Sequence, residues 1–230
     1  MSRPVHSKEK DYGNNFNSGT NSDFSEGWKE FETPWQAYPT GVELFSQGRT
    51  AQEVFCIDSG VVKLLRLESD GQELIVDLRF PDWLMGAASV IVQEPHPVTA
   101  VTLTPCRLRR MPASVFRYLV KSDVQLSWRL HRMHSRSVYD QVNRISQLAC
   151  LPARHRIEYF FRQLISALGL KQQKDITLPL PLKNSEIAAL VAVTPEYFSR
   201  MLKEMQREKV IRIGKGHLTI SDVQKLWRPL

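Results

Sequence analysis

The clearest pattern of hydrophobic and polar positions lies between Thr194 and Arg207, near the C-terminal end of the chain. Its apolar residues recur at intervals of three and four and share one helical face: Phe198, Met201, Leu202 and Met205. A narrow polar strip covers the opposite face, with one acid, one hydroxyl and three cations: Glu196, Ser199, Arg200, Lys203 and Arg207. The helix should begin at Pro195, because Thr194 can cap it and the first helical position needs no N–H.

A second, shorter helix is expected just upstream, over residues 184–191. Asn184 or Ser185 can cap it. Its apolar stripe consists of Ile187, Leu190 and Val191. Only residues 192–194 separate the two helices, and two short helices joined by a tight turn are typical of a helix-turn-helix, whose second helix enters the DNA major groove. From this spacing alone, an ordinary helical hairpin with a solvated charged face is an equally good interpretation.

Between Tyr38 and about Met111 the pattern changes to short apolar runs that glycines and other turn residues separate. Period-2 alternation and β-branched residues favour strands in these runs: 42–45, 54–57, 61–67, 74–79 and 98–103. Ser69-Asp70-Gly71 is a hairpin turn signal between two of them. Short strands at this spacing, with no helix expected between them, indicate an antiparallel sandwich or barrel.

Helices are expected after the strands, a short one over 112–121 and a long one over about 123–148. At 1.5 Å per residue the long helix spans about 39 Å, which is more than a small barrel requires. Its apolar seam repeats every three or four residues: Leu126, Leu130, Met133, Val138, Val142 and Ile145. We expect this seam to pack against a second copy of the chain as a parallel coiled coil. Packing within the same chain is the alternative.

The last third of the chain begins at a break, Leu151-Pro152-Ala153. A helix over 153–168 and a short edge strand over 176–182 are expected before the helix-turn-helix. Two short apolar runs after it flank Gly214-Lys215-Gly216, a hairpin with a cationic tip. A helix-turn-helix followed by such a hairpin is a winged helix, in which Lys215 would lie beside a DNA phosphate.

The charge distribution favours the interpretation as a nucleic-acid-binding protein. The chain has 230 residues and a formal net charge of +7. Residues 151–230 contain 14 Lys and Arg against 7 Asp and Glu, whereas the 150 residues before them carry 17 of each sign. The whole excess therefore lies in the part that carries the helix-turn-helix, as expected of a cationic DNA-binding domain attached to a neutral one.

Cysteine use and hydropathy predict a soluble, cytoplasmic protein. Cys56, Cys106 and Cys150 are far apart and form no CxxC motif, which fits reduced thiols, two of them in buried strands. Residues 1–27 lack the apolar core of a signal peptide. No apolar run approaches the roughly 18 residues of a membrane span, so we expect no membrane contact.

With strands first, then a long helix and a winged helix-turn-helix, the chain resembles the Crp/Fnr family of bacterial transcription regulators. The resemblance extends from Tyr38 to Leu226 and rests on short segments taken together: Tyr38-Pro39, Phe45-Ser46-Gln47-Gly48, residues 57–64, Gly71-Gln72-Glu73 and the helix-turn-helix. It implies an α+β fold with an N-terminal antiparallel β-roll of the jelly-roll type, like a cyclic-nucleotide-binding domain. The expected division is a mostly disordered extension at 1–35, a β-roll sensor domain at 36–121, a dimerisation helix at 122–150 and a winged helix-turn-helix domain at 151–230.

The resemblance also assigns DNA-binding residues. Glu196, Ser199 and Arg200 match the Fnr-like recognition motif, and they suit base edges because Arg can contact two guanine atoms and Glu can accept from cytosine. A homodimer on an inverted repeat of TTGA-like half-sites follows from this match. Phosphate contacts are expected from Lys183, Ser185, Thr194, Lys203, Arg207 and Lys215. The expected function is that of an activator that contacts RNA polymerase.

Two residues depart from the family pattern near the recognition helix. Pro195 stands where the Crp branch has another base-contacting Arg, so a Crp-type half-site is not expected. Ala192 replaces the usual glycine of the turn, which is tolerable if the backbone there avoids positive φ.

The expected effector pocket lacks the charged pair that cyclic-nucleotide-binding members use. It comprises Gly86, Ala87, Ser89, Val98 and Thr99. Ala87 stands at the position of the ribose-binding Glu, and Val98 or the preceding proline at that of the phosphate-binding Arg. Because a buried phosphate without a cation is costly, we expect no tight binding of cyclic AMP or cyclic GMP. An unknown small-molecule effector stays open.

No cofactor is predicted. A family-type iron–sulfur cluster needs four cysteines, and the chain has three, none of them in its N-terminal tail. Haem stays open, with His6, His96, His131 and His134 as candidate axial ligands. A cyclic-nucleotide- or haem-responsive regulator is therefore the main alternative. A cupin-type metalloenzyme is a remote one, because His96 stands alone where that fold clusters its metal ligands, and we expect no enzyme.

Overall fold

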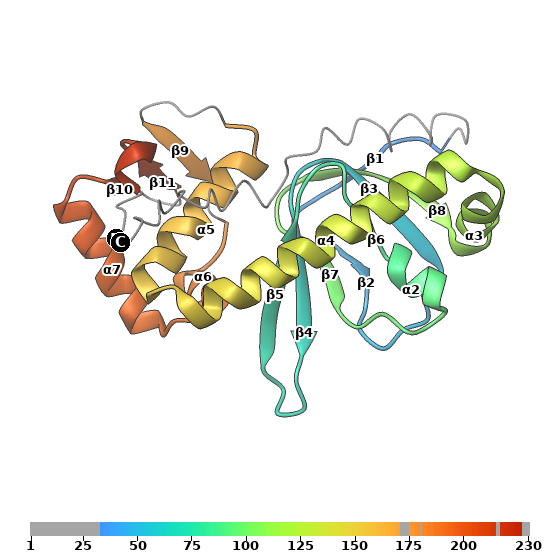
Figure 1. Ribbon diagram of the computed structural model, residues 1–230, viewed down its shortest axis with the longest axis horizontal. Helices are drawn as coiled ribbons and strands as arrows, with labels where there is room; N and C mark the ends of the chain where they lie inside the picture. The colour runs from blue at the N-terminus through green and yellow to red at the C-terminus, as the bar shows by residue number, and fades with distance from the viewer. Residues whose placement is uncertain (1–32, 171–174, 180, 215–216, 227–230) are drawn as a thin grey trace, which may run out of the picture.

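The computed structural model describes residues 33–170, 175–179, 181–214 and 217–226 of the chain. Its first half is built from two four-stranded antiparallel sheets (Figure 1), one with the order β1-β8-β3-β6 and the other β2-β7-β4-β5. The strands are β1 (Gln36–Tyr38), β2 (Glu43–Phe45), β3 (Glu53–Ser59), β4 (Val62–Leu67), β5 (Glu73–Arg79), β6 (Leu84–Met85), β7 (Thr99–Thr102) and β8 (Cys106–Pro112). The predicted α+β fold with an N-terminal antiparallel β-structure is confirmed.

Strand β3 is the centre of this half and is covered on both faces. Successive side chains of a strand point to opposite sides of a sheet. Phe55 and Ile57 pack with residues of the facing sheet, such as Leu64. Val54 and Cys56 pack on the other side, against the helices that follow the strands. Four consecutive residues of β3 are therefore buried, which a strand with one solvated face would not show.

A short helix, α2 (Ala87–Val92), lies between β6 and β7, so the prediction of strands without an intervening helix was wrong. Its sequence is rich in β-branched residues, but packing overrides that preference. Ala87 and Val90 are buried in the same cluster as Val54. Gly86 starts the helix in the left-handed region, at a φ of 80°. A Cβ at this position would lie 2.8 Å from the carbonyl oxygen of Glu53, so only glycine fits.

Two helices follow the strands as predicted, α3 (Ala113–Ser122) and the 27-residue α4 (Val124–Cys150). Asp123 caps α4, because its side chain accepts hydrogen bonds from the backbone N–H groups of Gln125 and Leu126, at 2.8 and 3.0 Å. In Figure 1, α4 crosses the middle of the molecule and connects its two halves.

The seam of α4 divides between two environments. Leu126, Leu130 and Met133 are buried within the same chain, in the cluster that contains Val54 of β3. These three residues therefore do not form a dimer seam, because the outer face of the sheet already covers them. The other three predicted seam residues are exposed: Val138, Val142 and Ile145.

The second half contains the predicted winged helix-turn-helix. Its elements are α5 (Ala153–Ala167), β9 (Ile176–Pro179), α6 (Asn184–Leu190), α7 (Pro195–Arg207), β10 (Ile211–Gly214), β11 (His217–Ile220) and a short 3-10 helix, η2 (Val223–Leu226). β10 and β11 pair as an antiparallel hairpin, and β9 is an edge strand beside β11, as expected. Leu151 and Pro152 separate α4 from α5, which confirms the break predicted there.

The two halves of the molecule pack directly against each other where α6 meets β5. Leu78 of β5 and Leu190 of α6 belong to one apolar cluster. Lys63 of β4 forms an ion pair with Glu186 of α6, with 3.1 Å between Nζ and Oε1. From α4, Arg144 donates to two backbone carbonyl groups, that of Val76 in β5 at 2.8 Å and that of Leu190 at 3.3 Å. Polar and apolar contacts together hold α6 on the sheet.

We predict that Leu130→Ala destabilises the protein by about 2–5 kcal/mol, because the deletion leaves a cavity under α4. Leu148, on the same helix, is 40% exposed, so Leu148→Ala should cost much less. Chemical denaturation of both variants measures the difference. Equal losses for the two variants would contradict the packing of α4 on β3.

Candidate DNA-binding site and effector pocket

Helix α7 begins as the sequence predicts. Pro195 occupies its first turn, and the hydroxyl oxygen of Thr194 accepts a hydrogen bond from the N–H of Tyr197 at 3.2 Å. The apolar face is buried: Phe198, Met201, Leu202 and Met205. This burial fixes the rotation of α7 about its axis, so the opposite face must point outward.

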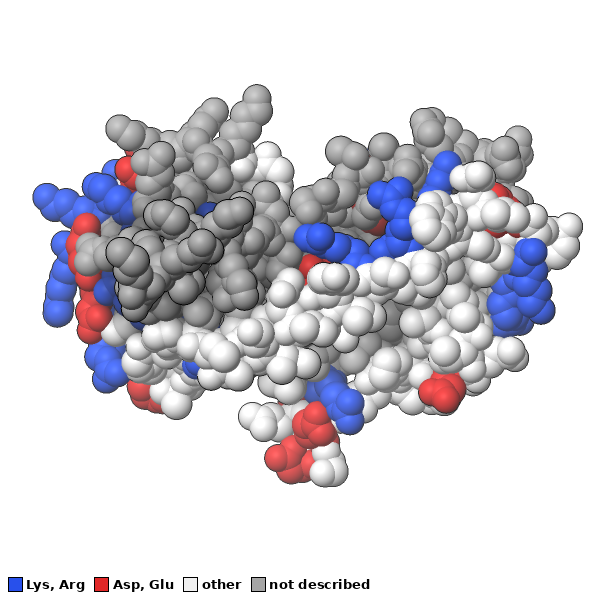
Figure 2. Space-filling view, viewed as in Figure 1, with Lys and Arg blue, Asp and Glu red and all other residues white. Residues whose placement is uncertain are grey.

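The outward face of α7 carries the predicted base-reading residues together. Glu196 and Arg200 are exposed, and Ser199 between them is half-buried. The guanidinium group of Arg200 lies over the ring of Tyr197, 5.0 Å from its centroid, which is a cation–π contact. Lys203 and Arg207 are exposed further along the helix. Figure 2 shows Lys and Arg side chains, with some acids among them, on the end of the molecule that α7 forms.

The predicted phosphate-binding residues of α6 lie at its exposed start. Lys183 and Ser185 are both exposed. Helix α6 begins at Asn184, so its N-cap residue is Lys183 and not Asn184 or Ser185. The side chain of Glu186 accepts a hydrogen bond from the backbone N–H of Lys183 at 2.7 Å, as in a capping box. The hydroxyl of Thr194 accepts from Tyr197 and can still donate to a phosphate. Lys215 lies outside the described residues.

The turn between the helices has a left-handed residue, Ala192, so the condition under which alanine is tolerable there is not met. Its φ is 52°. Arg156 of α5 compensates, because it donates to two backbone carbonyl groups of the turn, those of Val191 at 2.9 Å and Ala192 at 2.8 Å. It also donates to the carbonyl group of Leu151, just before α5, at 3.0 Å. Sequence reasoning missed Arg156, since nothing in its local pattern distinguishes it from a surface cation.

The predicted effector pocket corresponds to a cavity of about 440 Å³ between the β-structure and α4. Gly86, Ser89 and Val98 line it as predicted. Ala87 and Thr99 do not line it. Ala87, the first residue of α2, is buried in the apolar core. The hydroxyl oxygen of Thr99 accepts a hydrogen bond from the N–H of Gln47 at 2.9 Å.

The walls of this cavity are largely apolar, with two histidines and two arginines that the sequence did not assign to it. His96 stacks on Phe45 at a centroid distance of 3.9 Å. Burial lowers the pKa of His96 and, together with the charge of His131, that of His134, so both rings are neutral near pH 7.

Both arginines of the cavity are engaged with the protein itself. Arg79 donates to Asp77 at 2.5 Å and lies over the Trp83 ring at 4.2 Å. Arg144 makes the two backbone contacts given above. These residues lie far apart in sequence, on β5 and α4, so no motif could have pointed to them.

The cysteines are free thiols. Cys56 and Cys106 are buried in strands as predicted, and burial raises the pKa of Cys56 to about 12 and also raises that of Cys106. Cys150 is exposed at the end of α4. Within the described residues, His, Cys, Asp and Glu side chains form no group of three that could hold a metal ion. No helix in the described ranges has the length and apolar character needed to cross a bilayer.

A β-sandwich with an internal pocket, joined by a long helix to a winged helix-turn-helix, defines a class of proteins that couple a sensor domain to DNA binding. Comparison with known protein families supports this class. Residues 35–123 match the cyclic nucleotide-binding domain, and residues 156–228 match the Crp-like helix-turn-helix domain. The chain belongs to the Crp/Fnr family of transcription regulators. It is a DNA-binding regulator of transcription.

Individual relatives are similar over most of the chain. A CRP-like cAMP-activated global transcriptional regulator of Mycobacterium tuberculosis is 25% identical over 83% of this chain and 85% of its own. The transcriptional activator protein FnrA of Stutzerimonas stutzeri is 26% identical over 79% and 74%. The structure of FixK2 from Bradyrhizobium japonicum has the same fold, with a TM-score of 0.72 at 20% identity over 84% of this chain and 94% of that one.

Replacing Ala192 by glycine should stabilise the protein by about 0.5–1 kcal/mol, because glycine adopts positive φ without steric cost. Ala189, an exposed residue inside α6, is the matched control. Ala189→Gly should destabilise by a similar amount, since glycine weakens a helix interior. Thermal and denaturant unfolding of both variants test the opposite signs, and a loss of stability in Ala192→Gly would show that the turn is not strained.

Proposed function

We propose that the protein is a homodimeric activator that reads an inverted repeat of TTGA-like half-sites in cytoplasmic DNA and contacts RNA polymerase. The observation that carries this proposal is the outward-facing strip of Glu196, Ser199 and Arg200 on a helix whose rotation the buried face fixes. A fixed helix face presents side chains to base edges in one register, which sequence-specific reading requires. Lys203 and Arg207, on the same strip, would contact phosphates.

The contact between Arg200 and Tyr197 supports a base-reading role. A free arginine side chain loses much rotamer freedom when it binds a base. Stacking on Tyr197 restricts that freedom before DNA arrives, while it leaves the guanidinium nitrogen atoms available for guanine O6 and N7. Glu196, one helical turn before Arg200, can accept from a cytosine amino group.

The exposed apolar residues of α4 support a homodimer. An apolar stripe without cover from the described residues follows one side of the helix, with residues that are 58–78% exposed: Val124, Trp128, Val138, Tyr139, Val142 and Ile145. At about 100° per residue these residues occupy about 120° of the circumference. Figure 2 shows an uncharged band along one side of α4, with Lys and Arg side chains at its edge. A two-fold pair of such helices would bury the stripe and place two recognition helices on a palindrome.

The cavity near Gly86 supports an effector other than cyclic AMP. Its apolar walls and neutral histidines favour an uncharged or weakly polar ligand. A cyclic phosphate would have to compete with Asp77 for Arg79 and with backbone carbonyl groups for Arg144. The M. tuberculosis relative is named as cAMP-activated, so the two proteins would differ in this respect.

We predict that Arg200→Ala weakens binding to a TTGA palindrome by about 1–3 kcal/mol per half-site and relaxes the choice of base at the contacted guanine. Lys203→Ala is the control, because loss of a phosphate contact should weaken all sequences alike and reduce the salt slope by about one unit. Selection of bound DNA from a random pool, followed by titrations at several salt concentrations, measures both effects. An unchanged sequence preference in Arg200→Ala would refute the base-reading role.

We also predict that Val142→Asp converts the protein to a folded monomer with much weaker operator binding, because a charge in an apolar seam is not tolerated. Gln125→Asp, an exposed position of α4 outside the stripe, should leave the dimer intact. Analytical ultracentrifugation gives the mass, and circular dichroism checks the fold. A Val142→Asp protein that still sediments as a dimer would place the interface elsewhere.

A further inference from the structure

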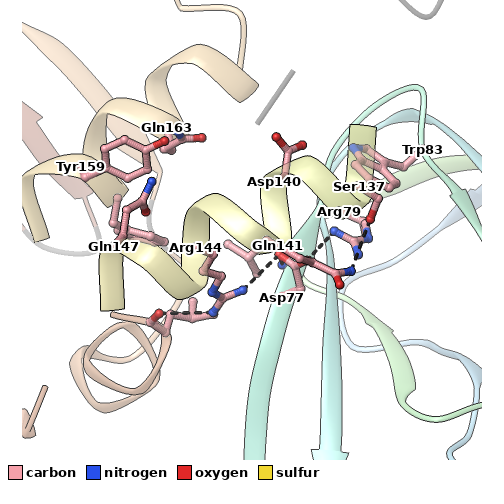
Figure 3. Close-up of a pocket in the computed structure, with 13 residues that line it drawn as sticks. Asp77, Arg79, Trp83, Ser137, Asp140, Gln141, Arg144, Gln147, Tyr159 and Gln163 are labelled. Atoms are coloured by element: carbon pink, nitrogen blue, oxygen red, sulfur yellow. Dashed lines mark hydrogen bonds and ion pairs between the residues drawn. The ribbon is translucent and has the colours of Figure 1, made fainter. Parts of the chain in front are cut away.

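A second, smaller cavity of about 110 Å³ lies at the junction of the two halves, beside the effector pocket. Its walls come from β5, the loop after it, and helices α4, α5 and α6. Figure 3 shows Tyr159 and Gln163 of α5 on one side, and Asp140 and Ser137 of α4 with Trp83 on the other. Phe160, Leu78 and Leu190 add apolar surface.

Two acceptor oxygen atoms in this cavity receive no hydrogen bond from the described residues. Gln163 is only 4% exposed, and its Oε1 has no donor. Oδ1 of Asp140 likewise has no hydrogen bond. It forms an ion pair with Arg136, with 3.4 Å between Oδ1 and Nε. Buried polar atoms in native proteins are nearly always paired, so these two oxygen atoms require a donor.

The cations that line the cavity do not supply that donor. Arg79 is bound to Asp77, and Arg144 donates to the carbonyl groups of Val76 and Leu190. Burial raises the pKa of Asp140 to about 6, and the charge of Asp77 adds to this effect, whereas Arg136 and Arg79 oppose it. The carboxylate is therefore only partly compensated, and a donor with positive charge would complement it best.

We propose that this cavity is a binding site for a compact organic cation, with a primary ammonium group between Asp140 and Gln163. A short apolar part of the ligand would rest on Trp83, Phe160 and Leu190. The size of the cavity restricts the ligand to a few non-hydrogen atoms beyond the ammonium group. The ligand of this site would carry a positive charge, whereas a cyclic nucleotide carries a negative one.

The position of the site gives its ligand a route to the DNA-binding elements. Leu190 ends α6, and its carbonyl group is held by Arg144, which also lines the cavity. A ligand here would contact β5, α4, α5 and α6 together, so it would change the stability of their junction. An effect of the ligand on operator affinity rests on the proposed function, whereas binding itself does not.

The test uses three probes of similar size: n-butylammonium, butyramide and butyrate. Calorimetric titration of the full-length protein near pH 7.5 should give a millimolar dissociation constant for n-butylammonium, in keeping with its few atoms. Binding of butyrate should be about tenfold weaker or undetectable. Asp140→Asn and Gln163→Leu should each weaken n-butylammonium about tenfold. Glu73→Gln, which removes an exposed carboxylate from β5, should have no effect.

Thermal unfolding of each variant checks that it is folded. Equal affinity for all three probes, or n-butylammonium binding that survives Asp140→Asn, would overturn the proposal. Absence of binding at tens of millimolar would overturn it as well, and would mean that only water fills the cavity. Titration with operator DNA is measured separately, so a protein that binds DNA but no cation contradicts this site and not the proposed function.

Discussion

One unbroken helix, α4, has to satisfy different neighbours along its length, and the arrangement of the whole molecule depends on it. At its start, Leu126 and Leu130 complete the outer core of β3. Further on, Arg144 holds β5 and α6, and an apolar stripe faces away from the described chain. A helix transmits displacement as a rigid element. A change in how the β-structure holds the first turns of α4 would therefore act on the junction beyond it.

Helix α6 is held at both ends by groups that suit its electrostatics. Glu186, in its first turn, accepts from a backbone N–H and pairs with Lys63. At its other end, Arg144 and Arg156 donate to the carbonyl groups of Leu190 and of the turn that follows. Acids are favourable at helix starts and cations at helix ends, where unpaired carbonyl groups lie. These contacts hold the end of α6 and the start of the turn that leads to α7.

The spacing of apolar residues was sufficient to predict an element wherever that element buries only one of its faces. The face of α7, the break at Pro152 and most strands were predicted because burial on one side leaves a regular spacing. The division of the α4 seam was not, since spacing shows that Leu130 and Val142 need cover but not which surface provides it. Helix α2, Arg156 and the smaller cavity were missed because they arise from contacts among residues distant in sequence, and the larger cavity was predicted only in part.

Gly86 limits how this sensor can diversify. A Cβ there would meet not only the Glu53 carbonyl group but also the ring of His96, at 3.3 Å, in the wall of the larger cavity. Any other residue in place of Gly86 would therefore crowd these two groups. New ligand preferences have to evolve at other residues that line the cavity, such as Ser89 and Val98. Proteins that evolve from this one would keep Gly86, while the other residues that line the cavity change.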